Sequence, residues 1–245
     1  MFKKDIVVYW SPKFFPEDVE ISPAVRDLHI RLKNMSGENP GRSLDIAKCP
    51  VAVKHFKNTF AVSSPVTYDL TFAENNVFTT CFDQDFYNNN VIVRDINTRL
   101  ISLLFGSVVF FTEEDSLIME MRNASYSPSA FNTSTTVLEG SIDIGRYFRF
   151  TDLAFFMNST TTVIEKNNTM YYVKFHSDKK IILKKFLMDE ALWRLYDQAI
   201  ESKKAVTPKL KKIPVWEKME RYYNSFKESR LKPSFINLIK QNLTE

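Results

Sequence analysis

The chain contains 245 residues, of which 44% are hydrophobic and 14% aromatic, which is enough apolar material for one large packed domain or for a domain with an appendage. Its five glycines form no cluster, which excludes the glycine-rich phosphate loops of P-loop enzymes, protein kinases and Rossmann oxidoreductases. The net charge of +4 falls in residues 186–245, where nine Lys and three Arg oppose eight Asp and Glu. Because acidic residues interrupt the basic ones, we interpret this tail as a solvated helical surface, and nucleic acid stays open as a partner through it.

The cysteines and the amino-terminal segment indicate the cellular compartment in which we expect the protein. Cys49 and Cys81 have no CxxC pair and no histidine at ligand spacing, whereas a structural zinc site needs four ligands in short paired spacings. We therefore expect two buried free thiols in a reducing compartment, with no metal and no cofactor. The apolar run Ile6–Trp10 is too short for a signal sequence or a membrane span, so we expect a soluble cytoplasmic protein without membrane contact.

The first hundred residues predict short strands between irregular segments. We expect a first strand at Ile6–Trp10, ending at Ser11-Pro12 because proline cannot donate to a strand ladder. Thr59–Val62 and Thr67–Phe72 flank Pro65 and predict either two strands or one broken strand. Residues 14–48 are predicted to be irregular apart from a short helix at Ala24–Lys33. The polar run Asn75–Asn90 predicts a loop or a loose hairpin, and Thr98–Phe105 is either a strand or a helical turn.

Residues 107–187 have the composition of successive strands. Short aromatic and β-branched runs, each bounded by polar or glycine residues, occur at 107–111, 117–121, 148–150, 153–157 and 171–175. The links are too short for crossover helices, so antiparallel pairing is expected, with a hairpin turn at Phe175–Lys180. Adjacent apolar residues in 146–150 and 153–157 predict strands covered on both faces.

The segment after Leu187 predicts helices. Asp189 is a plausible N-cap for a helix to about Lys203, and Pro214 and Pro233 stand in the first turns of two more. Since an isolated amphipathic helix is marginal in water, these helices should pack onto the β body or onto a neighbouring subunit. We expect the contacts to be made by Trp193, Leu195, Trp216, Tyr223 and Phe235. The prediction is a mainly β, α+β fold: a β-sandwich or β-clip-like body over residues 1–187 and a helical appendage over residues 188–245.

The sequence contains no catalytic motif that is as clear as these strand and helix patterns. His176 in Phe175-His176-Ser177-Asp178 has the His-x-Asp form that begins the iron triad of jelly-roll oxygenases, but no histidine follows it to complete such a triad. A Ser or Cys nucleophile would need a base held by a third group, and the three scattered histidines offer none. A metal-dependent oxygenase is therefore only a third hypothesis.

The segment Leu138–Tyr147 places two glycines and an aspartate between apolar residues. It resembles the Gly-x-Ile-Asp-x-x-Tyr-Arg-Gly element of the dUTP pyrophosphatase and dCTP deaminase family, which has a β-clip fold. Thr67-Tyr68-Asp69-Leu70 is similar to that family's Gly-Tyr-Asp-Leu element. Ser127-Pro128-Ser129 stands where its Arg-Ser-Gly phosphate element lies, although the arginine is missing unless Arg122 supplies it. The family's glycine-rich C-terminal phosphate arm is absent.

This resemblance implies a nucleotide-binding or nucleotide-hydrolysing enzyme as one hypothesis. Asp143 would then be the base, Asp69 a metal or fold residue and Tyr147 the group that stacks on the sugar. Arg122 and Ser127 would bind the nucleotide. The three side chains of Asp143, Arg122 and Ser127 would have to converge in one cleft.

A second resemblance extends over a similar stretch. Lys48-Cys49-Pro50, Asn58-Thr59-Phe60, Leu138–Asp143 and Tyr172–Phe175 resemble a family of uncharacterised phage and bacterial all-β proteins, and the Asn-, Lys- and Phe-rich composition is compatible with an AT-rich phage genome. The first hypothesis is therefore a phage-type accessory or structural interaction protein, without a readable catalytic centre. It would act in the host cytoplasm or the virion with a protein partner or as a homo-oligomer.

Overall fold

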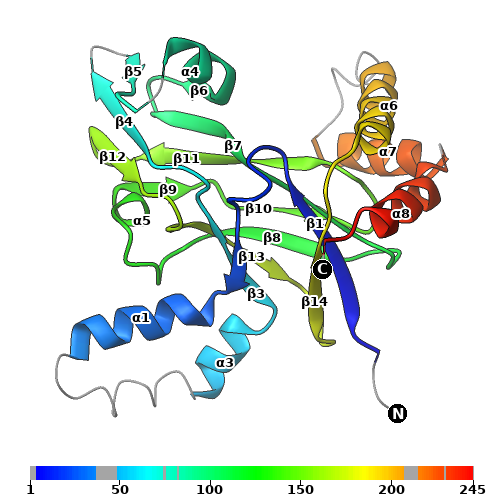
Figure 1. The fold of residues 1–245 in the computed structure, drawn as a ribbon, viewed down its shortest axis with the longest axis horizontal. Coiled ribbons are helices and arrows are strands. Elements are labelled where there is room, and N and C mark those ends of the chain that lie inside the picture. Colours follow the sequence, from blue (N-terminus) through cyan, green and yellow to red (C-terminus); the bar gives the residue numbers. More distant parts are fainter. Residues whose placement is uncertain are drawn as a thin grey trace.

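The computed structural model describes residues 4–36, 49–73, 76–81, 83–206, 215–228 and 230–244. These residues form three β-sheets with helices packed around them (Figure 1). The large, six-stranded sheet contains β1 (Ile6–Pro12), β6 (Val91–Asp95), β7 (Leu100–Thr112), β9 (Thr135–Val137), β11 (Phe150–Met157) and β14 (Ile181–Lys185). The second, five-stranded sheet contains β2 (Ile21–Pro23), β3 (Thr59–Ser63), β8 (Ile118–Asn123), β10 (Gly140–Asp143) and β13 (Thr169–Phe175). The small sheet contains β4 (Tyr68–Ala73), β5 (Asn76–Phe78) and β12 (Thr161–Ile164).

The helices fall into separate groups along the chain. Two near the amino terminus are α1 (Val25–Ser36) and α3 (Pro50–Phe56). Two short helices are α4 (Gln84–Asn90) and α5 (Ala130–Ser134). The carboxy-terminal group is α6 (Glu190–Val206), α7 (Val215–Glu228) and α8 (Leu231–Gln241). Figure 1 shows the first and last groups at opposite ends of the view.

The large and second sheets enclose a shared apolar core, as in a sandwich. Successive residues of β7 point to opposite faces, because side chains alternate along a strand. Phe110 packs in the core between the sheets, and its neighbour Phe111 packs against the carboxy-terminal helices. Tyr172 in β13 likewise faces α1 and α3, whereas Val173 faces the central core. The β-sandwich body with a helical carboxy-terminal segment confirms the predicted fold class.

The carboxy-terminal helices are fixed to the large sheet by aromatic packing. Phe235 is fully buried and stacks on Phe148 with ring centroids 4.2 Å apart, and Trp193 stacks on Phe150 at 5.5 Å. Tyr223 is buried in the same apolar cluster between the helices and the sheet, and Leu195 is partly buried and packs against this cluster. This confirms the predicted contacts of all but Trp216, whose side chain lies outside the described residues.

The chain end closes this helical segment back onto the body. Asp189 caps α6 as predicted, because its Oδ1 accepts a hydrogen bond from the Leu192 N–H at 2.8 Å. Its other oxygen accepts a bond from the Asn242 side chain at 2.9 Å, just beyond α8. Leu187 N–H donates to the Asn242 carbonyl at 3.0 Å. The start and the end of the helical segment are thus joined at one point beside β14.

Two predictions about strand pairing are wrong. β14 pairs in parallel with β1, with Ile6 opposite Ile181, so the body is not wholly antiparallel. The segment Phe175–Lys180 is not a hairpin, because β13 belongs to the second sheet and β14 to the large one. It crosses between sheets, and Asn58 supports it by donating to the carbonyls of Ser177 and Lys179, both at 2.9 Å.

Several local predictions also differ from the structure. The first strand continues through Pro12, which lies beyond the end of the β14 ladder and needs no N–H donor there. Both cysteines are exposed, since Cys49 precedes α3 and Cys81 follows β5 in connecting segments. The run 75–90 contains β5 and α4, and β11 alternates between buried and partly exposed residues rather than being covered on both faces.

Removing the Phe235 ring tests the helical docking. We expect Phe235→Ala to lower the free energy of unfolding by about 3–5 kcal/mol, because it empties a fully buried site against Phe148. Urea denaturation followed by circular dichroism measures this. Phe78→Ala is the matched control, since Phe78 lies on edge strand β5 with 47% of its surface exposed, and its effect should be well below 1 kcal/mol. Equal losses in the two variants would contradict the packing described.

Candidate functional site

Asp143 closes the turn at the end of β10. The residue is 4% exposed. Its Oδ1 accepts hydrogen bonds from the backbone N–H groups of Leu117 and Gly145, each at 3.0 Å, and its Oδ2 accepts one from Ser116 Oγ at 2.6 Å. Its own N–H donates to the Tyr223 hydroxyl at 3.1 Å. The carboxylate therefore ties the β10 turn to the start of β8, and these contacts direct its oxygens into the turn and not toward a substrate.

Tyr147 lies in the apolar cluster beneath the helices. It is 5% exposed, and its ring packs edge-on against Phe226 at 5.4 Å and Tyr223 at 6.5 Å. Burial raises the pKa of Tyr147 to about 12. A ring enclosed in this way has no open face on which a sugar could stack.

Asp69 organises the loop that follows β5. Its Oδ1 accepts hydrogen bonds from Thr79 Oγ1 at 3.0 Å and from the N–H groups of Thr80 and Cys81 at 2.9 and 3.0 Å, and its Oδ2 accepts one from Thr80 Oγ1 at 2.8 Å. Burial opposes ionisation of Asp69, but these hydrogen bonds together hold its pKa below the ordinary value. Of its two predicted roles, the fold role matches these contacts.

Arg122 and Ser127 line different hollows. Arg122 donates to Glu120 Oε2 at 2.8 Å and borders a small hollow of 170 Å³ with His55 and Tyr126. Ser127 is buried on the wall of a larger cavity. Asp143 lines neither of these two hollows. The structure therefore does not bring the side chains of Asp143, Arg122 and Ser127 into one of them, as the nucleotide hypothesis requires.

The His-x-Asp pair of the oxygenase hypothesis points to different partners. His176 Nε2 lies 2.7 Å from Glu120 Oε2, whereas Asp178 is 91% exposed and faces Lys57 Nζ at 3.8 Å. Among the residues that the structure describes, no three His, Cys, Asp or Glu side chains gather closely enough to hold a metal ion.

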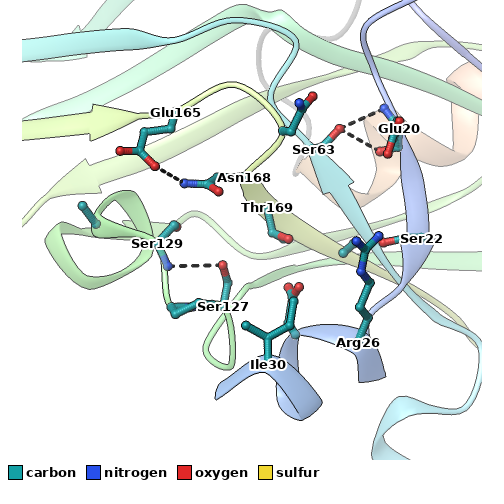
Figure 2. A pocket seen from close by; sticks show the side chains of 15 residues that line it. Glu20, Ser22, Arg26, Ile30, Ser63, Ser127, Ser129, Glu165, Asn168 and Thr169 are labelled. Carbon is teal, nitrogen blue, oxygen red and sulfur yellow. Dashed lines mark hydrogen bonds between the residues drawn. The ribbon is translucent and has the colours of Figure 1, made fainter. Parts of the chain in front are cut away.

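The cavity that contains Ser127 is the best candidate for a functional site, and its volume is 620 Å³ (Figure 2). Cavities of this size commonly hold small ligands or side chains of a partner. Most of its lining residues are polar, and they come from several segments: Glu20, Ser22, Arg26, Asp27, Ile30, Ala61, Ser63, Ser127, Pro128, Ser129, Ala130, Glu165, Asn167, Asn168 and Thr169.

The floor of the cavity is the outer face of the second sheet where helix α1 does not cover it. Ser22 pairs with Ala61 across β2 and β3, and Ser63 pairs with Thr169 across β3 and β13. These small side chains leave depth above the sheet. Leu28 of α1 packs on the neighbouring part of the same face, so the helix forms one wall. The segment 127–130 and the turn between β12 and β13 form the opposite wall (Figure 2).

Three carboxylates and one guanidinium line this cavity. Asp27 is only 7% exposed, and its Oδ2 accepts a hydrogen bond from the Tyr172 hydroxyl at 3.0 Å. Glu165 Oε2 accepts one from Asn168 Nδ2 at 2.8 Å (Figure 2). Glu20 bonds to Ser63 only through its backbone, with its N–H donating at 2.9 Å and its carbonyl accepting at 3.1 Å. Carboxylate oxygens remain available in the cavity, because each carboxylate can accept several hydrogen bonds.

Of the residues that line the cavity, the sequence motifs had pointed only to Ser127-Pro128-Ser129. Asp27 and Tyr172 meet although 145 positions separate them, and no local pattern signals such a pair. A weak signal was present at Asp27, because an acidic residue on the covered face of a helix needs a buried partner. Glu20 and Glu165 lie in turns, where acidic residues are ordinary.

Comparison with known proteins was made for the whole chain, and no protein-family model, no curated protein and no solved structure matches it. Both family resemblances therefore stay predictions. Within the described ranges, no helix is long and apolar enough to cross a membrane.

The turn that holds Asp143 depends on a glycine. A Cβ on Gly145 would lie 2.5 Å from the Glu114 carbonyl oxygen and 2.9 Å from the Ser116 backbone, whereas a Cβ on Gly140 would meet nothing within 4 Å. We expect Gly145→Ala to lower the free energy of unfolding by about 3 kcal/mol and Gly140→Ala to change it by less than about 1 kcal/mol. Thermal unfolding of the two variants measures the difference, and equal stabilities would refute the close approach.

The nucleotide hypothesis has a direct assay. We expect no magnesium-dependent release of pyrophosphate from dUTP or of ammonia from dCTP, because the Asp143 carboxylate is engaged in its own turn and triphosphate chemistry needs converging cations. Asp143→Asn is the informative variant, since an amide oxygen can still accept from both backbone N–H groups. Turnover that is lost in Asp143→Asn, with an unchanged circular dichroism spectrum, would make the enzyme hypothesis the preferred one.

Proposed function

We propose that this protein is a non-catalytic interaction protein whose polar cavity receives a basic segment of a partner protein. The supporting observation is the charge of the 620 Å³ cavity, where Glu20, Asp27 and Glu165 oppose only Arg26. Complementary charge steers a partner to its site and fixes its orientation more than it adds affinity. A Lys or Arg side chain lying on the small-residue floor would reach these carboxylates.

Catalysis is less well supported at this place. The lining includes Ser22, Ser63, Ser127 and Ser129 but no histidine, lysine or cysteine. A serine nucleophile needs an adjacent base within hydrogen-bonding reach. The Ser63 hydroxyl is already engaged, accepting from the Glu20 N–H and donating to the Glu20 carbonyl. The cavity is thus better suited to binding than to reaction.

The phage-type origin and the cytoplasmic or virion location belong to this proposal through the sequence resemblance. The nucleotide-hydrolysing enzyme is the alternative, and the dUTP and dCTP assay distinguishes it. Self-association is a separate possibility for the same chain, and light scattering on the purified protein measures it independently of peptide binding.

A basic peptide tests the proposal. We expect fluorescein-labelled hexalysine to bind in a fluorescence anisotropy titration at low salt and to weaken as salt is added, because screening reduces exposed charge pairs. Glu20→Gln with Glu165→Gln should weaken binding about tenfold, from two pairs worth about 0.7 kcal/mol each. Arg26→Gln should strengthen it, since it removes the positive charge of the cavity.

Asp85→Asn is the matched control, because Asp85 is an exposed acid in the first turn of α4 and does not line the cavity. It should leave the affinity for hexalysine unchanged. The proposal fails if hexalysine does not bind, or if the double variant and the control weaken it equally.

A further inference from the structure

A second cavity lies where the carboxy-terminal helices meet the turns of the β body. Its volume is 670 Å³. The lining residues are Asp115, Gly145, Arg146, Tyr223, Asn224, Phe226, Lys227, Arg230, Lys232 and Pro233. Four of these are cationic and one is acidic, which is the reverse of the charge in the first cavity.

Lys232 is the most enclosed of these cations. Its ammonium donates to the carbonyl oxygens of Glu114 at 2.6 Å and Gly145 at 2.7 Å. An ammonium has three donors, and among the described residues Lys232 has no oxygen acceptor for the third, although the ammonium also lies 5.9 Å from the centre of the Phe111 ring. Burial lowers the pKa of Lys232, and the nearby carboxylates of Asp115, Asp143, Glu114 and Glu113 oppose that shift without reversing it. An anionic oxygen in the cavity would satisfy the third donor and favour the charged form.

The other cations differ in how far they are already neutralised. Arg146 pairs with Glu220 through two hydrogen bonds of 3.1 and 2.9 Å and lies over the Tyr223 ring at 4.6 Å. Lys227 and Arg230 are exposed, and their side chains form no ion pair within the described part of the chain. The cavity is therefore lined by two cations without an ion pair, Lys227 and Arg230, and by the Lys232 ammonium with one unused donor.

The apolar part of the wall narrows the class of ligand. Phe226 lines the cavity beside the cations but is only 3% exposed, whereas Pro233 is exposed, so an organic group can lie against Pro233. Donors that come from several directions suit a tetrahedral oxyanion with several acceptor oxygens better than a planar carboxylate. The first turn of α8 begins beside the cavity, and its N–H groups add to the positive potential.

We propose that this cavity binds a small phosphomonoester, with the phosphate between Lys227, Arg230 and Lys232 and its organic group against Pro233. The same phosphate chemistry could come from free inorganic phosphate or from a nucleic-acid backbone. The experiment separates these sources by using inorganic phosphate, phenyl phosphate and a single-stranded deoxythymidine 12-mer as probes. This site is distinct from the cavity proposed to receive a basic peptide.

Isothermal titration calorimetry on the full chain measures the three probes. Phenyl phosphate should bind at least tenfold more tightly than inorganic phosphate. Lys227→Gln with Arg230→Gln should weaken phenyl phosphate at least tenfold, whereas Lys218→Gln with Arg221→Gln should not. The second pair removes the same charge from α7 but does not line the cavity. Both cavity substitutions are at exposed positions, so folding is preserved, and a matching circular dichroism spectrum verifies this.

Three results would overturn the inference. These are no binding of phenyl phosphate, equal weakening by the two double variants, and 12-mer binding that is tighter than phenyl phosphate and equally sensitive to both pairs. The last result would indicate a diffuse basic surface for nucleic acid instead of a site. Glu20→Gln with Glu165→Gln should leave phenyl phosphate binding unchanged, which separates this result from that of the proposed function.

Discussion

The structure depends on a large sheet whose adjacent strands β1 and β7 carry apolar residues on both faces. Along β7, Phe110 and Phe111 are buried on opposite sides, and β1 repeats the arrangement with Trp10 and Tyr9. A sheet of this kind cannot leave either face in water, because each exposed aromatic ring would forfeit on the order of 2 kcal/mol of transfer free energy. The second sheet covers one face, and the carboxy-terminal helices cover the other face around Tyr9, Phe111 and Phe150. The helices are therefore a required layer of the fold.

That requirement also explains how both cavities arise. Helix α1 covers the outer face of the second sheet only as far as Leu28 and Ala61, and the polar cavity lies where this cover ends. Helices α7 and α8 cover the large sheet, and the basic cavity lies where they meet the Asp143 turn. In both places the packed elements fix the walls, and side chains with spare hydrogen-bonding capacity face the space between them.

Much of the fold could be predicted because its signals are local. Strand composition identified β3, β4, β8, β13 and the second half of β7, and a single aspartate at position 189 marked the start of α6. The parallel pairing of β1 with β14 could not be found in this way, since the strands are 175 residues apart at Ile6 and Ile181 and no local pattern sets their register. Short elements such as β2 and β5 have too few residues to show a period. The exposure of Cys49 depends on its place in a connection, which composition does not reveal.

The candidate sites were harder to predict for a related reason. Sequence motifs drew attention to Asp143, Asp69 and Tyr147, and in the structure the first two hold turns while the third is part of a core. An aspartate between glycines is favoured wherever a turn needs a strong acceptor for backbone N–H groups, so the motif has the same appearance in a catalytic loop and in a structural one. Apart from Ser127–Ser129 and Gly145-Arg146, the residues that line the two cavities belong to no such motif, because Asp27, Lys232 and their neighbours come together only when distant segments pack. A candidate binding residue differs from a structural one here in having a donor or acceptor that the fold leaves without a partner. Asp143 and Lys232 both bond to Gly145, Asp143 accepting from its N–H at 3.0 Å and Lys232 donating to its carbonyl oxygen at 2.7 Å. The Asp143 carboxylate is fully engaged in its turn, whereas the Lys232 ammonium keeps a donor that can bind a ligand.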